Sequence, residues 1–132
     1  RSLLADPRKI STKHQVNAIK RRQKFRPFAP AILEEYCTDY FEMPGHSRYM
    51  SYVYQCKRPH DIPAVLHVDN SARVQTVPES SESILREILE VWYEHTGCPV
   101  LLNTSLNIRG MPMVNDFCDA LNFSSKYNVS VF

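Results

Sequence analysis

The scarcity of glycine is the feature that most limits what this chain can fold into. Only three glycines, Gly45, Gly97 and Gly110, occur among 132 residues, against nine prolines. A P-loop and a dinucleotide-binding fingerprint both need clustered glycines where the backbone wraps a phosphate, so neither can be formed. Two large classes of nucleotide-binding fold are therefore excluded, and any phosphate binding must use side chains.

The length and composition indicate a single compact domain over residues 1–132. A hydrophobic fraction of 43% and a charged fraction of 23% are ordinary for a globular protein of this size. No apolar run approaches the ~18 residues of a membrane helix, and no signal-peptide stretch is present, so we expect no membrane partner and a cytoplasmic location. The net charge of +2 is too small to indicate a nucleic-acid partner.

The four cysteines indicate neither zinc nor disulfides. Cys37, Cys56, Cys98 and Cys118 are about twenty residues apart and form no C-x-x-C pair, which argues against a structural zinc site. Without a secretion signal, we expect reduced and mostly buried thiols.

The clearest predicted helix spans residues 83–95. Its apolar residues recur at helical spacing, and Gly97 supplies the stop. We expect the face that packs against a sheet to consist of Ile84, Ile88, Val91 and Trp92.

Other elements are predicted more weakly. Ser11 can cap a helix that runs to about Arg22, and prolines exclude regular helix from FRPFAP, residues 25–30. The remaining predicted elements are a strand beginning at Ile32, a helix over 34–41, a strand over 49–56, a hairpin turning at 69–71, a buried strand over 99–102, a helix over 116–124 and a closing strand over 129–132. Hairpins mixed with single helices indicate a mixed α+β (α/β) fold class.

A basic cluster leads into FRPFAP and consists of Lys20, Arg21, Arg22, Lys24 and Arg26. Lysine brings a point charge to a phosphate, and arginine brings a planar fork. At a helix end, Lys20 and Arg22 can converge on one anion. The alternative is a solvated basic helix end favoured by the helix dipole.

A second polar cluster surrounds the predicted hairpin. If both halves are strands, His67 and Asp69 share one face, as do Arg73 and Gln75. A metal pair from His67 and Asp69 lacks further ligands nearby, so we expect no metal site. The alternative to a binding role is a surface hairpin with cross-strand polar pairs.

A third cluster follows the predicted buried strand. Asn103, Ser105 and Asn107 lie in an Asn- and Ser-rich loop that the strand would hold in place. Their donors and acceptors suit ribose, phosphate or an amide group. The alternative is turn chemistry, because Asn and Ser also bond their own backbone.

Five motifs at these clusters resemble, in order, the C-terminal domain of O-carbamoyltransferases, the family of nodulation-factor, cephamycin and aminoglycoside carbamoyltransferases. The motifs are RSLLADPR, IKRRQKFRPFAP, SRYM, IPAVLHVDNSARVQTV and PVLLNTSLNIRGMPMV, and the match extends from Arg1 to about Leu121. The resemblance implies a YrdC-like fold, a twisted open mixed sheet packed by helices.

The resemblance also implies an activity. A domain of this kind would join ATP and carbamoyl phosphate into a carbamoyl-adenylate, with Mg²⁺ held mainly by phosphate and water. An N-terminal Kae1-like domain of the same enzyme, which holds a metal, would pass the carbamoyl group to an acceptor hydroxyl. The family has G-P-R-A-L-G-x before this chain's first Arg-Ser, so residues 1–132 look like an excised domain without that partner.

Site residues are carried over motif by motif. Lys20 and Arg22 fall on the family's I-K-x-R motif, which looks like the phosphate-gripping K-x-R of YrdC proteins, and Arg73 falls on H-x-D-G-T-A-R. These three are expected to be catalytic, and we expect Lys20, Arg22, Arg73, Asn103, Ser105 and Asn107 to lie round one concave pocket. The expected substrate-binding residues are Arg8, Arg26, His67, Asn103, Ser105 and Asn107.

The chain departs from the family pattern at a few positions. Gln23 replaces Glu, Asn70-Ser71 replaces Gly-Thr, Leu106 replaces Phe and Met111 replaces Glu. The basic and Asn/Ser positions are kept, which preserves the expected anion binding, whereas Met111 puts a carboxylate role at that position in doubt.

Two other functions stay open: a non-catalytic module that binds RNA through residues 21–25, and a degenerate domain that only docks a partner domain. A salt titration tests the RNA-binding module, and ATP binding distinguishes the catalytic domain from the degenerate one.

Overall fold

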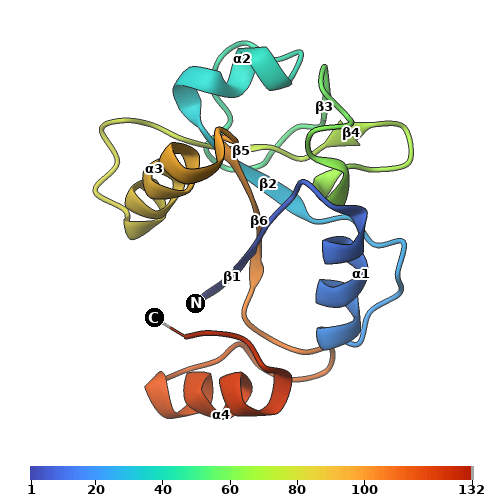
Figure 1. The fold of residues 1–132 in the computed structure, drawn as a ribbon, viewed down its shortest axis with the longest axis vertical. Coiled ribbons are helices and arrows are strands. Elements are labelled where there is room, and N and C mark those ends of the chain that lie inside the picture. The colour runs from blue at the N-terminus through green and yellow to red at the C-terminus, as the bar shows by residue number, and fades with distance from the viewer. Residues whose placement is uncertain (132) are drawn as a thin grey trace.

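The computed structural model describes residues 1–131 and shows an open, mixed sheet with packed helices (Figure 1). The elements are β1 (Ser2–Ala5), α1 (Ile10–Ile19), β2 (Ala29–Leu33), η1 (Glu34–Tyr36), α2 (Cys37–Tyr40), β3 (Tyr54–Gln55), η2 (Pro63–Val65), β4 (Ser71–Ala72), β5 (Gln75–Val77), α3 (Ile84–Thr96), β6 (Val100–Ser105) and α4 (Phe117–Tyr127).

The main sheet has the strand order β1-β6-β2-β5, in which β6 is antiparallel to both neighbours and β2 is parallel to β5. β3 and β4 form a separate antiparallel pair. The mixed fold class is confirmed.

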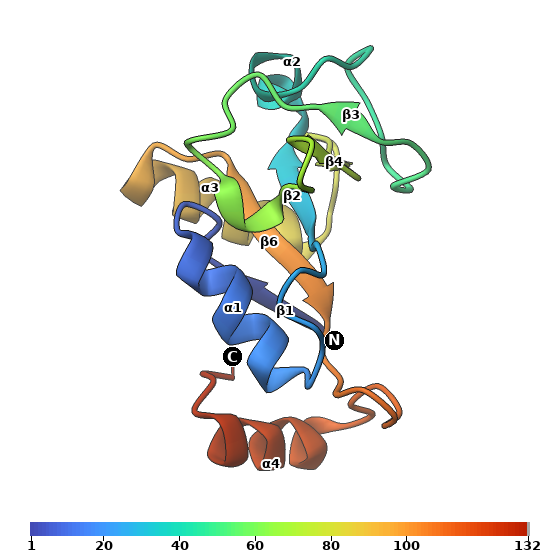
Figure 2. The ribbon, with the colours of Figure 1, turned by 90° about the vertical axis from the view of Figure 1, so that its right-hand side faces the viewer.

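The main sheet separates two apolar clusters, and α1 and α3 lie on its opposite sides (Figures 1 and 2). Alternate residues of a strand point to opposite faces, so Ile32, Val100 and Leu102 contribute to the larger cluster, which includes Val16 of α1. The smaller cluster lies under α3 and consists of Ala31, Leu33, Val77, Leu89 and Leu101.

The face under α3 is apolar at one end and polar at the other. Leu101 lies under α3, whereas Asn103 and Ser105, the next residues of β6 on that face, are half-buried and exposed. Gln75 of β5 shares the face, because it pairs with Ala31, which in turn pairs with Leu101. α3 therefore leaves a polar part of the sheet uncovered, and this part borders the candidate site.

The limits of α3 match the predicted helix, but of its predicted packed face only Trp92 packs on the sheet. Ser83 caps the helix by accepting a hydrogen bond from the Leu85 amide at 3.2 Å, and Gly97 ends it with a φ of 67°. Trp92 is half-buried and donates from Nε1 to the Val100 carbonyl at 3.0 Å. The expected contact of Ile84, Ile88 and Val91 with the sheet is wrong, since all three are exposed.

Arg86 explains the rotation of the packed face of α3. Its guanidinium donates to the Val77 carbonyl at 3.1 Å and pairs with Glu35 at 2.7 Å, so a charged residue occupies the buried side beside Leu89. The spacing of apolar residues in the sequence does not identify a charged residue such as Arg86 as part of the packed face. No helix within residues 1–131 is both long and apolar enough to cross a membrane.

α1 starts slightly earlier than predicted and ends earlier than predicted. It starts at Ile10, with Lys9 at the N-cap position and no side-chain cap, so the expected capping by Ser11 is wrong. The helix ends at Ile19 rather than near Arg22, and Arg21 adopts a left-handed φ of 52°. Lys20 and Arg22 therefore lie in the turn that leaves the helix.

Several predicted strands differ from the observed ones. The strand expected over 49–56 is reduced to Tyr54–Gln55, and the strand expected from Ile32 begins earlier, within FRPFAP. The hairpin turning at 69–71 is wrong, because β4 pairs with β3 whereas β5 pairs with β2. Of the closing strand expected over 129–132, residues 129–131 have no regular structure, and residue 132 lies outside the described residues.

Candidate anion-binding site

A cavity of about 210 Å³ lies where the end of α1 meets the loop that follows β6. Within residues 1–131, no carboxylate lines it and none of its cations forms a salt bridge. Uncompensated positive charge in a concave site favours an anionic ligand. The lining residues are Lys20, Arg22, Arg26, Arg109, Ser105 and Asn107.

Asn17 positions the basic loop that follows α1. It is fully buried in the last turns of the helix, and its Nδ2 donates to the carbonyls of Lys24 at 3.3 Å and Arg26 at 2.9 Å. The Arg22 amide returns to the Asn17 carbonyl at 2.9 Å. These bonds fold residues 22–26 back against α1, which brings Arg22 and Arg26 to the same cavity as Lys20.

Lys20 joins this turn to the loop after β6. Its ammonium group donates to the Asn107 side-chain oxygen at 2.9 Å, to the Asn107 carbonyl at 3.1 Å and to the Ser105 carbonyl. The side chain is almost fully buried, and this burial, with a smaller contribution from the Arg22 charge, lowers the pKa of Lys20 to about 8. Lys20 is therefore a cation at neutral pH that loses its proton under mildly basic conditions.

The hydrogen bonds of Asn107 fix the orientation of its amide. Oδ1 accepts from Lys20 and also from the Ser105 hydroxyl at 2.7 Å. These two donors identify the amide oxygen of Asn107. Within residues 1–131, the amide nitrogen Nδ2 takes part in no side-chain hydrogen bond. Asn107 therefore has a free donor group on a residue that lines the cavity.

Arg22 has an unsatisfied donor. Its guanidinium lies 5.4 Å from the centre of the Phe28 ring, and within residues 1–131 its buried Nε atom has no hydrogen-bond partner. Burial, and then the charge of Arg26, lowers the pKa of Arg22. A buried N–H without a partner is costly, so an anion that accepts from Arg22 would stabilise the site.

Arg109 lines the cavity but was not among the residues selected from the sequence. Its backbone amide donates to the Lys20 carbonyl at 3.1 Å, which fixes the loop against the end of α1. The sequence feature that could have indicated Arg109 is its position two residues after Asn107, in the same candidate loop.

Five of the nine predicted site residues share this cavity: Lys20, Arg22, Arg26, Ser105 and Asn107. Arg73 and Asn103 do not line it, so the expectation of one pocket holding all six named residues is wrong for these two. Arg73 is exposed, because the segment that carries it crosses from β4 to β5 instead of returning in a hairpin. Asn103 lies farther back on β6 and donates to the Gln75 side chain at 2.9 Å.

Arg8 and His67 also lie outside the cavity lining. Arg8 forms a two-bond pair with Asp6, at 2.9 and 2.8 Å, and its guanidinium is 5.0 Å from the centre of the Trp92 ring. The Ser71 hydroxyl donates to Asp69 at 2.6 Å, so its oxygen accepts from His67 Nδ1 at 3.0 Å. These contacts give both residues local structural partners, and their roles in substrate binding stay predictions.

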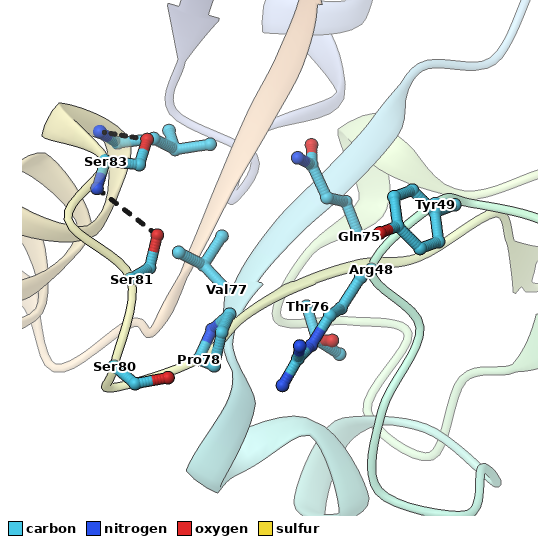
Figure 3. A pocket seen from close by; sticks show the side chains of 10 residues that line it. Arg48, Tyr49, Gln75, Thr76, Val77, Pro78, Ser80, Ser81 and Ser83 are labelled. Atoms are coloured by element: carbon cyan, nitrogen blue, oxygen red, sulfur yellow. Dashed lines mark hydrogen bonds between the residues drawn. The ribbon is translucent and has the colours of Figure 1, made fainter.

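A second cavity, of about 350 Å³, borders the same face of the sheet (Figure 3). Ser80, Ser81 and Ser83 come from the loop before α3, and Arg48 and Tyr49 lie on the other side. Gln75 also lines this cavity and bonds to Asn103, which is two residues before Ser105 on β6. The Asn103–Gln75 pair therefore lies between the two cavities.

The cysteines offer no activated nucleophile. Cys37, Cys56 and Cys98 are buried free thiols, and burial raises the pKa of each, while Cys118 is exposed and also free. Within residues 1–131, no group of three or more His, Cys, Asp or Glu side chains is arranged to hold a metal ion.

The fold and the cavity define the chain as a mixed α/β domain with an uncompensated cationic site. Residues 1–132 match the family described as Carbamoyltransferase C-terminus. The chain is 39% identical over 127 residues to nodulation protein NolNO of Sinorhizobium fredii, covering 92% of this chain and 19% of that protein. It is 35% identical over 130 residues to 3'-hydroxymethylcephem-O-carbamoyltransferase of Amycolatopsis lactamdurans, covering 98% of this chain and 25% of that enzyme.

The chain therefore belongs to the carbamoyltransferase C-terminal family, which confirms the resemblance found in its motifs. It spans between 19% and 25% of the length of these two relatives.

Proposed function

We propose that this domain forms a carbamoyl-adenylate from ATP and carbamoyl phosphate, and that another domain of the same protein transfers the carbamoyl group to an acceptor hydroxyl. The observation that carries the proposal is the cavity with four cations and no carboxylate. Both substrates are phosphates, and family membership supplies the carbamoyl chemistry. The role of an O-carbamoyltransferase also agrees with the name of the Amycolatopsis relative.

The physical task of such a site is to bring two anions together. Lys20, Arg22 and Arg109 would offset the repulsion between the substrates and the charge that grows on phosphate oxygens in the transition state. Alignment of two reactants can contribute about 7–11 kcal/mol to lowering a barrier, so a rigid site needs no covalent nucleophile. The fixed Asn107 amide and the anchoring of the loop by Lys20 and Arg109 supply such rigidity.

The chemical step balances with one water. Hydrolysis of carbamoyl phosphate releases phosphate and leaves carbamate, whose oxygen attacks the α-phosphorus of ATP. A new P–O bond forms, the bond to the β-phosphate oxygen breaks, and pyrophosphate leaves with the electron pair. The cationic residues would stabilise the leaving pyrophosphate, and the free Nδ2 donor of Asn107 suits a phosphate or carbamate oxygen.

Mg²⁺ would arrive bound to ATP and supply further neutralisation of the phosphate charge. The residues fit this arrangement, because the cavity lining holds no carboxylate to compete for the ion. Ser105 and Asn107 provide the only neutral oxygens on the side chains of that lining. The protein would therefore contact the phosphates directly, and the metal only through them.

The test is mass-spectrometric detection of carbamoyl-adenylate in the full-length protein with ATP, Mg²⁺ and carbamoyl phosphate. Arg22→Ala should reduce formation of the adenylate and weaken ATP binding about tenfold or more, because a charged hydrogen bond is worth ~1.5–3 kcal/mol. Arg58→Ala is the matched control, since Arg58 contacts Tyr40 and does not line the cavity.

Arg73→Ala separates two versions of the proposal. The family motif predicts a loss of activity similar to that of Arg22→Ala, whereas the geometry of the cavity predicts an effect closer to the Arg58→Ala control. Absence of both ATP binding and adenylate in the full-length protein would contradict the proposed function.

A further inference from the structure

α3 carries apolar side chains on two opposite sides. One side, with Leu89 and half-buried Tyr93, packs on the sheet. The opposite side has a stripe of Ile84, Ile88 and Val91, whose exposed fractions are 71%, 40% and 55%. Spacings of four and three residues place the stripe along one line of the helix. A helix that is apolar on both sides is normally buried on both, whereas nothing within residues 1–131 covers this stripe.

The edges of the stripe differ in chemistry. By helical geometry, Glu87 and Glu94 flank one edge, and both are exposed. The other edge continues into half-buried Leu85 and Trp92. The exposed surface is thus an apolar strip that ends at exposed His95 and has one acidic border, which fits an apolar partner surface that carries basic groups along one side.

We propose that the Ile84–Ile88–Val91 stripe is the docking surface for the part of the full-length protein that lies outside these 132 residues. The two relatives described above have 75% or more of their length outside the matched region, so each contains ample chain to cover it. This inference stands independently of the carbamoyl-adenylate chemistry.

The position and rigidity of α3 also support docking of the remainder of the full-length protein on the stripe. Ser83 and Leu85, at the start of the helix, line the 350 Å³ cavity, so a segment seated on the stripe also lies beside that cavity. Arg86 attaches the helix to the rest of the domain through an ion pair of 2.7 Å to Glu35 and a hydrogen bond of 3.1 Å to the Val77 carbonyl. A rigid surface that needs no reordering loses little conformational entropy on docking.

The acidic border argues against an antiparallel pairing of two copies through this stripe. In an antiparallel two-fold contact, the same edges of the two helices face each other, so Glu87 and Glu94 would oppose the identical residues of the other copy. Like charges placed together across an interface are unfavourable. A different surface with basic groups avoids this repulsion.

The test uses the full-length protein with single cysteine substitutions and peptide-resolved maleimide labelling. Val91→Cys is matched by Val53→Cys, since both valines are 55% exposed within this domain. We expect Val91→Cys to be labelled about tenfold or more slowly than Val53→Cys under native conditions, because the docked segment must move away before maleimide can reach the cysteine. In denaturant the two cysteines should be labelled equally fast. Ile84→Cys, at a residue 71% exposed in this domain, serves as the second variant and should be protected in the same way.

Equal native labelling of Val91→Cys and Val53→Cys would overturn the proposal. Protection that appears only as the protein concentration rises, together with a dimer in light scattering, would identify a second copy as the occupant and would also overturn it. Protection in a monomer at all concentrations supports docking within the chain. Adenylate formation is not part of this readout, so loss of the proposed function would leave the result unaffected.

Discussion

At the residue scale, Lys20 combines a structural and an electrostatic role. Its ammonium group holds the loop after β6 through acceptors on Ser105 and Asn107, and it lines the cationic cavity. Its pKa of about 8 means that the charge depends on pH in a range where arginine does not titrate. The cavity should therefore lose one of its four charges under mildly basic conditions.

This titration gives a pH prediction for anion binding. The protonated form of Lys20 attracts an anion and the neutral form does not, so affinity should be highest below pH 8 and fall as pH rises through 8. Because three arginines of the lining remain, the fall should level off above the pKa at the affinity of the cavity with neutral Lys20. Sulfate titration by calorimetry between pH 7 and pH 9 measures this without titration of the ligand itself. Lys20→Met should bind more weakly and show no such slope, and an unchanged slope in that variant would contradict the assignment.

The contacts of His67 predict one ring tautomer. Asp69 accepts the hydrogen bond of the Ser71 hydroxyl, so His67 donates from Nδ1 to the Ser71 oxygen, and neutral His67 should keep Nε2 as an acceptor. The Ser71 bond also lowers the pKa of the Asp69 carboxyl, which keeps this acceptor ionised. Nitrogen NMR of the neutral imidazole should find the proton on Nδ1. Ser71→Ala should shift the population toward Nε2–H, and an Nε2–H ring in the unsubstituted protein would refute the tautomer.

At the element scale, α3 stabilises the small cluster on its side of the sheet. Leu89 is fully buried there, whereas Leu121 of α4 is 47% exposed. Leu89→Ala should lower the free energy of unfolding by about 2–5 kcal/mol, because it leaves a cavity in a packed core. Leu121→Ala makes the same chemical change at an exposed site and should cost far less. Urea unfolding of both variants measures the difference, and similar losses would show that α3 contributes little to the core.

The elements that could be predicted from the sequence are those set by local signals. Ser83 and Gly97 defined the limits of α3 because capping chemistry depends on neighbouring residues. The face of α3 depended on partners far along the chain, chiefly Glu35 for Arg86, and could not be read from apolar spacing.

The hairpin prediction failed for the same physical reason. Ser47 donates from its hydroxyl to the Val74 carbonyl and from its amide to the Thr76 side chain, both at 2.9 Å. These contacts fix residues 74–76 beside the loop at Ser47, and β5 pairs with β2 instead of returning along β4. Local strand patterns contain no information about such a distant partner.

At the scale of the whole molecule, the candidate site depends on a contact between distant segments. Lys20 and Asn107 are 87 residues apart and share a hydrogen bond, a convergence that composition and spacing could not supply. Resemblance to a family indicated five of the lining residues, while Arg109 was missed and Arg73 misplaced. Sequence spacing could not place the basic loop, because one buried amide, that of Asn17, determines the path of this loop.

The arrangement of the elements also predicts unequal stability across the fold. β6 is paired on both sides, with β1 and β2, and Val100 and Leu102 are fully buried. α4 lies at the foot of the molecule in Figure 1, and only Ala120 and Phe123 of its 11 residues are buried. A helix of this length is marginal without tertiary packing, so α4 should open more often than the sheet.

Hydrogen exchange measured by NMR should therefore find the β6 amides the most protected and those of α4 about a hundredfold or more faster, a difference of ~2.7 kcal/mol in opening free energy. Phe123→Ala removes the main buried contact of α4, so it should increase exchange in the helix while leaving β6 nearly unchanged. Leu121→Ala is the exposed control on the same helix and should leave both rates almost unaltered. Equal protection of α4 and β6, or a parallel loss of protection in both on Phe123→Ala, would show that the helix unfolds only together with the sheet.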